Sequence, residues 1–505
     1  MTIPKTSLPE KDRSVGDQVL VGTLWIGAWR WMARVIGFAS IVIIARLLLP
    51  EDFGIVASAL LIVMFFDIMI ELGTDSYLIR LESPNRKDYD TAWTLRVLVV
   101  SAAALVMFFG AGFLANFFGD ERLLPVIQVL SAASLLRGFT NIGLTMYRRE
   151  LRFSFIAAYG IGQRLSGFVA TVTLAFLWEN YWAVIVGECV VSITGVVLSY
   201  FLHSYRPSFC LLEVKKQWKF CKWIVVRNTA MFLNGRADQF VIAKYFGMDL
   251  VGFYAMAVRF AEFPTRHLLA PMFMPVYSGL SKKQGDDSAF SRSVLQVIGA
   301  TCVVLLPAVM MIGLLREELV LAILGDNWVT AIPLIVPVVT ALAAIVLAEA
   351  SVNVLTLIGR IRLLAVLQWG SAICVALGMV LAAQWNDLAV VAWVRALLAG
   401  VFVLICYGFL WRDLSQPITS LLGSFCRPAI ASMAMAVVLI GIKSLSLDPW
   451  GTLIAGGMAA LVTYLVVLYV IWRLSGSPKS GEAMLAGRLV KLTGNGIKSM
   501  KRRFA

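Results

Sequence analysis

Apolar residues run in long blocks along this chain, separated by short polar segments. Fourteen of these blocks are long enough to cross a bilayer as a helix, which takes about 20 residues. We place them at residues 18–46, 53–79, 92–118, 123–147, 153–178, 181–203, 220–243, 251–279, 290–314, 329–357, 363–384, 388–410, 425–442 and 450–472. The pattern predicts an all-α polytopic membrane protein with 14 transmembrane helices.

The basic residues are distributed unevenly over the connecting segments. With the amino terminus in the cytoplasm, inner segments carry 28 of the 44 Lys and Arg residues and outer loops carry five. Cytoplasmic loops of membrane proteins show this excess. One miscounted helix would abolish the alternation, so we predict that both termini are cytoplasmic.

A repeat with an offset of 198 residues relates the two halves of the chain. Without gaps, it aligns Gly37–Ala59 with Gly235–Ala257. Seven pairs are identical: Gly37/Gly235, Ala39/Ala237, Ile44/Ile242, Ala45/Ala243, Gly54/Gly252, Ala57/Ala255 and Ala59/Ala257. Chance similarity between Ala- and Gly-rich helices is the alternative, but a fixed period favours two homologous halves. Because the offset spans an even number of helices, the repeat is parallel, as in two-lobed transporters.

This repeat divides the chain into two lobes of six helices and an addition. We expect a cytoplasmic amino terminus at 1–17, an N-lobe at 18–203, a cytoplasmic connector at 204–219, a C-lobe at 220–410, two further helices at 425–472 and a basic cytoplasmic tail at 473–505.

Composition excludes several classes of function. Hydrophobic residues make up 60% of the chain and charged residues 15%, a balance typical of membrane proteins. The net charge of +14 is explained by orientation in the membrane, so nucleic acid is not an expected partner. The seven cysteines include no CxxC pair, and we predict no metal and no cofactor.

Charged residues inside the predicted spans are the candidates for function. They are mostly arginines, and a guanidinium group is suited to binding phosphate. The candidate substrate-binding residues are Arg30, Arg34, Arg137, Arg164, Arg227, Asn234, Arg236, Arg259 and Arg266. The candidates for ion coupling are the acids Asp67, Glu71, Asp238, Glu262 and Glu349. Arg30 and Arg34, four residues apart, share one helix face.

A purely structural role is the alternative for several of these groups. Arg96, Arg292 and Arg395 lie near span ends, where long side chains reach the interface. Arg236 with Asp238, and Glu262 with Arg259 or Arg266, are candidate internal ion pairs.

Two segments resemble a known family. They are ARLLLPEDFGIVASALLIVMFFDIMIELGTDSYLI and GRADQFVIAKYFGMDLVGFYAMAVRFAEFPTRHLLAPMFMPVYSGLSK. They resemble the polysaccharide transporter family, which includes Wzx-type flippases, within the multidrug/oligosaccharidyl-lipid/polysaccharide exporter superfamily. The likeness in length and helix count covers residues 15–475.

The resemblance implies a flippase of the bacterial inner membrane and no enzyme. Its expected substrate is a polyprenyl-diphosphate-linked oligosaccharide repeat unit, moved from the cytoplasmic to the periplasmic leaflet by alternating access of a cationic central cavity. Membrane lipid, a proton or sodium ion, and polysaccharide polymerase machinery are the other expected partners. Related flippases use cationic residues near the first helix, which Arg30 and Arg34 match by location only. A multidrug exporter and a membrane glycosyltransferase or ligase are the alternatives.

Overall fold

The computed structural model describes residues 15–70, 73–262, 265, 280, 287–414, 418–445 and 447–476. These residues are helical and include no strand, which confirms the all-helical class. The long helices are α1 (Val15–Leu47), α2 (Pro50–Ile70), α4 (Arg86–Phe118), α5 (Leu123–Gly138), α7 (Phe153–Trp178), α8 (Trp182–Leu202), α9 (Val214–Tyr245), α10 (Met248–Glu262), α12 (Asp287–Leu314), α14 (Ile332–Leu357), α15 (Ile361–Ala383), α16 (Leu388–Asp413), α17 (Ile418–Lys443) and α19 (Gly457–Leu474). The short ones are α3 (Thr74–Arg80), α6 (Gly143–Arg149), α13 (Arg316–Leu319), η2 (Val320–Leu324), η3 (Asp326–Ala331), α18 (Pro449–Gly451) and η4 (Thr452–Gly456).

Many of these helices have the length and apolarity that a membrane span needs. In the part of the chain that the structure describes, nine qualify, or ten if the bent pair α5–α6 is one span. The chain is therefore a multi-pass membrane protein. The total of fourteen spans and the cytoplasmic position of the termini stay predictions.

Two predicted spans are not continuous helices. The predicted span 53–79 is divided into α2 and α3, and Gly73 between them has a φ of 68°, which favours glycine. The predicted span 123–147 is bent by 58° between α5 and α6. At that bend Asn141 is buried and its side-chain amide donates to the carbonyl of Tyr205 at 2.7 Å. Hydrophobic length taken over the whole block does not report such breaks, even though α3 and α6 are more polar than α2 and α5.

The helix boundaries follow the 198-residue offset. Helix α1 ends at Leu47 and α9 at Tyr245, while α2 begins at Pro50 and α10 at Met248. Ile44 and its repeat mate Ile242 accept the corresponding turn hydrogen bonds from Leu48 and Phe246, at 2.9 and 3.0 Å. Both isoleucines are buried. These shared boundaries support the repeat.

The described chain forms two compact units, residues Met1–Phe232 and Leu233–Ala505. The division falls inside α9, beyond the predicted connector 204–219. Residues 1–14 and 477–505, which include most of the predicted termini, lie outside the described residues. The predicted domain limits stay predictions.

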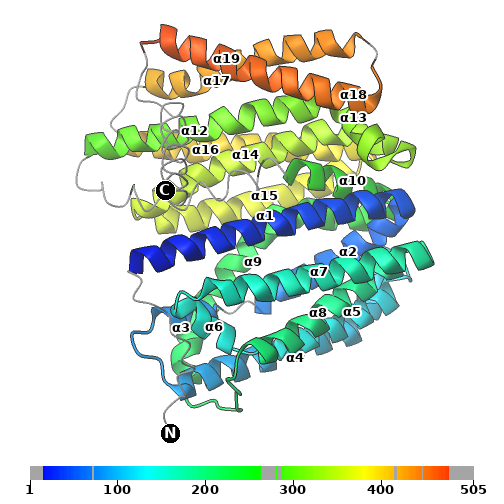
Figure 1. Ribbon diagram of the computed structural model, residues 1–505, viewed down its shortest axis with the longest axis vertical. Coiled ribbons are helices and arrows are strands. Elements are labelled where there is room, and N and C mark those ends of the chain that lie inside the picture. The colour runs from blue at the N-terminus through cyan, green and yellow to red at the C-terminus, as the bar shows by residue number, and fades with distance from the viewer. Residues whose placement is uncertain are drawn as a thin grey trace, which may run out of the picture. The chain divides into compact units, whose positions relative to one another are not determined.

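Unit 1 is a set of long helices that pack at close range through small residues. Helices α7 and α8 lie side by side (Figure 1), with Gly167 of α7 against Val191 of α8 and Gly187 of α8 against Thr171 of α7. Helices α4 and α5 pack against each other in the same unit. Small residues at helix interfaces let backbones approach closely, which is how helices associate in a membrane.

The carboxylate of Asp90 on α4 binds the segment that follows α8. Asp90 is buried and accepts hydrogen bonds from the hydroxyl of Tyr205 at 2.7 Å and from the backbone N–H and hydroxyl of Ser208 at 3.1 and 2.8 Å. Gln217, in the first turn of α9, also donates to the carbonyl of Asp88 at 2.9 Å. The segment 203–217 is therefore part of unit 1.

Unit 2 contains the helices that follow the predicted repeat. Helices α17 and α19 pack against α12 around buried Leu439 and Tyr464. The hydroxyl of Tyr464 donates to the carbonyl of Val303 at 2.6 Å. The two predicted additional helices at 425–472 are thus integrated into this unit through a shared core.

Replacing Asp90 tests the attachment of this segment. Asp90→Ala leaves the buried hydroxyl of Tyr205 and the donors of Ser208 without an acceptor, which we expect to lower the free energy of unfolding by about 2–4 kcal/mol. Thermal unfolding in detergent measures the loss. The exposed Glu121→Ala is the control, and equal midpoints for both variants would contradict this role.

His203, which directly follows α8, provides a pH test of the same region. Its Nδ1 accepts a hydrogen bond from the backbone N–H of Tyr205 at 2.9 Å, and burial together with Arg152 and Arg206 holds its pKa below the usual 6.5. The unfolded chain therefore takes up this proton first, so stability falls as the pH drops from about 7 to about 5.

We expect His203→Gln to reduce this pH dependence and His267→Gln, at the other histidine of the chain, to retain it. Unfolding midpoints measured between pH 7 and 5 report the difference. Identical pH slopes in wild type and His203→Gln would rule out this histidine as the source.

Candidate functional site

Helices α1 and α7 meet through two contacts made to glycines. The ring of Trp29 on α1 lies over Gly160 of α7, and the guanidinium of Arg164 on α7 lies over Gly37 of α1. Further along, Ile44 and Leu48 pack with Ala175. Because these contacts occur in the same order along both helices, α1 and α7 run in the same direction. This matches the prediction for the first and fifth spans.

Three arginines gather on this pair of helices, and we call Arg30, Arg34 and Arg164 the arginine cluster. Arg30 and Arg34 are successive residues of one face of α1, and Gly37, under Arg164, continues that face. The guanidinium of Arg34 also lies over the ring of Trp31, 5.1 Å from its centroid. Among the described residues, no carboxylate lies within 4.0 Å of any of the three guanidinium groups. Within the described part of the chain, the cluster therefore carries positive charge without an acidic partner.

Arg137 of the same unit is paired. Its Nη1 lies 3.1 Å from Oδ2 of Asp67 on α2, and its Nη2 donates to the hydroxyl of Ser134 at 2.7 Å. Both side chains of the ion pair are 37% exposed. The structure thus joins a predicted substrate-binding residue to a predicted coupling acid.

Unit 2 contains a buried network of two ion pairs. Arg236 of α9 pairs with Glu262 of α10 at 3.0 Å. Asp238 of α9 accepts a hydrogen bond from the hydroxyl of Tyr254 at 2.6 Å and lies 3.8 Å from Nε of Arg395 on α16. Among the described residues, each of these two pairs joins one arginine to one acid.

The network surrounds a very small cavity. Arg395 is only 3% exposed, and its Nη2 donates to the carbonyl of Asn234 at 2.9 Å. The side-chain amide oxygen of Asn234 accepts from Ser371 at 3.4 Å. Oδ1 of Asp238 has no hydrogen-bond partner among the described residues, and the cavity beside it measures about 10 Å³, close to the space of one water molecule.

The structure shows ion pairs between helices in place of the predicted pair of Arg236 with Asp238. Arg236 pairs with Glu262, while Asp238 pairs with Arg395. The pairing of Glu262 with Arg259 or Arg266 stays a prediction. Arg395 does not reach the interface, because Asp238 and the carbonyl of Asn234 hold it inside the unit. Arg96 does not reach it either: it donates to the carbonyls of Gly138 and Thr140 at the end of α5. Spacing along one helix could not identify partners on other helices.

The other predicted site residues are exposed or lie outside the described residues. Arg259 and Glu349 are exposed on α10 and α14. The side chain of Arg227 and all of Arg266 and Glu71 lie outside the described residues. Sequence reasoning missed Tyr254 and the pairing of Arg395, for which nothing in the sequence is a signal. It also missed Gly37 as a contact of Arg164, although Gly37 stands in the repeat.

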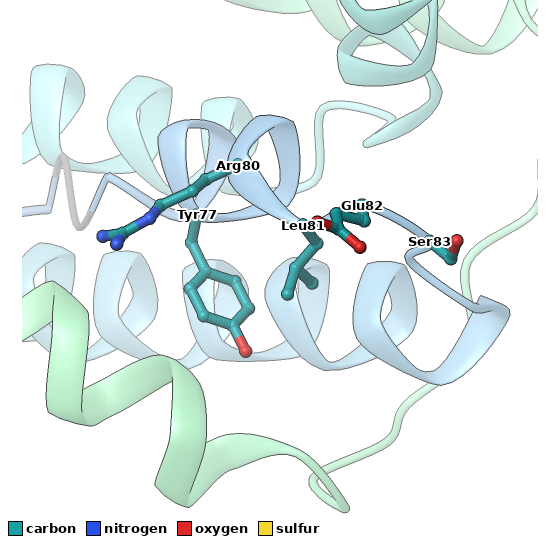
Figure 2. Close-up of a pocket in the computed structure, with 5 residues that line it drawn as sticks. All are labelled: Tyr77, Arg80, Leu81, Glu82 and Ser83. Atoms are coloured by element: carbon teal, nitrogen blue, oxygen red, sulfur yellow. The ribbon is translucent and has the colours of Figure 1, made fainter.

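An open pocket of about 550 Å³ lies on unit 1, along α3 and the loop that follows it (Figure 2). Tyr77, Arg80, Leu81, Glu82 and Ser83 line it, so both signs of charge are present. Arg149 supports its wall by donating to the carbonyls of Leu81 and Glu82. Over the described part of the chain, no group of three His, Cys, Asp or Glu side chains could hold a metal ion.

Long apolar helices, a repeated pair of helices and arginines at depth define a polytopic transporter-like membrane protein. Residues 43–333 match the family described as "Polysaccharide biosynthesis protein", which is more than half of the chain. The chain belongs to this family and to the polysaccharide transporter group that the two quoted segments resemble.

Several curated proteins are similar over most of the chain. The succinoglycan biosynthesis transport protein ExoT of Rhizobium meliloti (strain 1021) is 24% identical over 441 residues, covering 86% of this chain and 87% of that protein. The teichuronic acid biosynthesis protein TuaB of Bacillus subtilis (strain 168) is 19% identical, covering 94% and 99%. The lipopolysaccharide biosynthesis protein WzxC of Escherichia coli (strain K12) is 22% identical, covering 64% and 66%.

Solved structures show the same fold. The lipid II flippase MurJ in an inward closed conformation aligns with a TM-score of 0.72 at 13% identity, covering 90% of this chain and 99% of that one. An inward-facing multidrug resistance transporter of the MATE family, MOP superfamily, aligns with a TM-score of 0.59 at 13% identity, covering 75% and 94%. At this identity the likeness concerns the fold alone.

Breaking the buried pair tests whether it stabilises unit 2. Arg395→Met leaves Asp238 uncompensated in an apolar surrounding, and we expect a loss of about 3–5 kcal/mol of unfolding free energy. Adding Asp238→Asn to Arg395→Met should recover part of that loss. Unfolding midpoints in detergent report both effects, with Arg292→Met, whose exposed side chain donates hydrogen bonds to Ser288 of its own helix, as the control. An Arg395→Met midpoint equal to that of wild type would contradict the pairing.

Proposed function

We propose that this chain is a flippase for a polyprenyl-diphosphate-linked oligosaccharide. It moves the repeat unit from the cytoplasmic to the periplasmic leaflet, for the assembly of exopolysaccharide, capsule or lipopolysaccharide. The family match and the names of the relatives, which concern polysaccharide and lipopolysaccharide biosynthesis and transport, support this proposal.

The observation that carries the proposal is the charge imbalance in unit 1. In unit 2 the acids Glu262 and Asp238 neutralise Arg236 and Arg395. The arginine cluster has no such partners among the described residues. Uncompensated positive charge in an apolar surrounding is costly, and it is retained where an anion binds. A diphosphate supplies that anion, and the planar guanidinium groups offer it pairs of parallel hydrogen bonds.

The chemistry of translocation follows from the substrate. A diphosphate cannot enter about 30 Å of hydrocarbon without losing its hydration, at a prohibitive cost. Arginine side chains replace the lost water, while the polyprenyl tail stays in the bilayer. Alternating access of a cationic cavity then releases the sugar on the other side.

The coupling ion of this cycle is a proton or sodium. Asp67, Glu262, Glu349 and Asp238 are the described candidates, and the unpartnered Oδ1 of Asp238 favours the last of these. We further propose an inner-membrane location, both termini in the cytoplasm, fourteen spans divided as the sequence predicts, and polymerase machinery as a partner in the cell.

Two other functions give different outcomes. A multidrug exporter shares the fold, but organic cations need acidic or aromatic sites, which the arginine cluster does not offer. A glycosyltransferase or ligase would form new sugar bonds. Transport of a lipophilic cation, or incorporation of sugar by the purified protein, would favour one of these.

The decisive experiment removes the arginine cluster in purified protein. We expect Arg30→Ala with Arg34→Ala to slow flipping of a fluorescent polyprenyl-diphosphate sugar in proteoliposomes by at least about tenfold. Arg34→Lys should retain an intermediate rate, because lysine keeps the charge but not the planar pair of donors. Arg292→Ala, which removes the same charge elsewhere, is the control.

Cells without the native copy provide a second measurement. At matched protein levels, the double variant should accumulate lipid-linked precursor and display less surface polymer. Wild-type flipping by Arg30→Ala, Arg34→Ala and the double variant would remove the arginine cluster from the mechanism. A wild-type protein that flips no lipid-linked sugar would refute the function itself.

A further inference from the structure

Gly37 has an unusual relation to Arg164. A Cβ atom at position 37 would lie 2.5 Å from Nη2 of Arg164, and the three nearest heavy atoms all belong to that guanidinium group. Real Cβ atoms are not found this close to another heavy atom. The guanidinium therefore occupies the space that any side chain at position 37 would take.

We propose that Gly37 is a positioning residue for the anion site: its missing side chain admits Arg164 to the α1 face that carries Arg30 and Arg34. This proposal rests on the proposed function and deepens it, because it assigns a third guanidinium group to the diphosphate. Gly37 is three residues beyond Arg34, about 4.5 Å along the helix axis, so Arg164 extends the row of positive charges by one position.

The surroundings of Arg164 show that this contact is separate from the packing of the helices. Trp29 over Gly160 brings α1 and α7 together one turn before Arg164, and the apolar contacts around Ile44 hold them together further along. The Arg164 side chain is exposed and has no carboxylate partner among the described residues, so the helix pair does not need it as an ion pair. The guanidinium group of Arg164 over Gly37 is thus available to a ligand.

The second half of the repeat gives independent support. Gly235 is the repeat mate of Gly37, and it lines the small cavity of unit 2 together with Arg395. The two units share this arrangement. Arg164 of α7 approaches α1 at Gly37, and Arg395 of α16 approaches α9 near Gly235. In unit 2, Asp238 neutralises that arginine. In unit 1 the arginine remains available to an external anion.

The first test is the substitution Gly37→Ala. The three heavy atoms nearest to the added methyl group belong to Arg164, a flexible side chain that moves aside, and alanine raises helix propensity, so the protein should fold normally. We expect Gly37→Ala to slow flipping by about tenfold, as Arg164→Ala does, because both remove one guanidinium group from the anion. Gly27→Ala on the same helix, where a Cβ would meet nothing within 4 Å, is the matched control and should flip normally.

The second test separates positioning from packing. Gly37→Ala should cost nothing further in an Arg164→Ala background, because the group that it displaces is already absent. Gly160→Ala, which would meet the ring of Trp29 at 2.5 Å, should instead add its effect to that of Arg164→Ala. Additive losses for Gly37→Ala and Arg164→Ala would overturn the proposal, as would normal flipping by either single variant.

A binding measurement keeps this proposal distinct from the function on which it rests. Calorimetry with inorganic diphosphate should show weaker binding to Gly37→Ala and Arg164→Ala than to wild type and Gly27→Ala, with the Gly37→Ala/Arg164→Ala double variant equal to Arg164→Ala. This pattern without any flipping of lipid-linked sugar would refute the flippase and leave the role of Gly37 standing. If wild type flips the lipid-linked sugar but Gly37→Ala binds diphosphate as tightly as wild type, the flippase stands and the role of Gly37 is refuted.

Discussion

The cost of placing charge in an apolar surrounding governs this structure. A buried charge needs either an opposite charge or a ligand. Unit 2 meets this requirement internally, since Arg236 and Arg395 each face an acid. In unit 1, Arg137 pairs with Asp67, whereas Arg30 and Arg164 of the arginine cluster are exposed and have no acid within 4.0 Å among the described residues. The two halves therefore use one repeated scaffold for different electrostatic purposes.

The repeat explains how this difference can arise on a common framework. Helix ends separated by 198 residues and buried residues such as Ile44 and Ile242 keep the paired elements alike. The charged positions are not constrained in this way, because they make contacts with helices outside the repeated stretch. Arg395 comes from α16 and Arg164 from α7. Divergence of the charges therefore leaves the backbone unchanged.

Hydrophobic length and loop charge were sufficient to predict an all-helical membrane protein and the ends of most helices, α7 among them. They did not predict the break at Gly73, although the polar residues Thr74, Asp75 and Ser76 that follow it are a signal that the apolar run ends there. The arginines were recognisable as candidates by their depth in the spans. Their partners were not, because the pairs Asp238 with Arg395 and Asp67 with Arg137 join residues 157 and 70 positions apart. Nearness in space across such separations leaves no periodic pattern in one sequence.

Helix α9 begins in one unit and ends in the other, and the division after Phe232 falls in the middle of its continuous hydrogen-bonded ladder. A loop accommodates an added residue by bulging outward. In a helix, each added residue rotates everything that follows it by about 100° about the helix axis. One residue inserted after Phe232 would keep Gln217 on Asp88 and Asp238 with Arg395 and Tyr254, because each set of partners lies within one unit. An insertion at this point would therefore change the register between the two parts of α9 and leave the chemistry within each unit as it is.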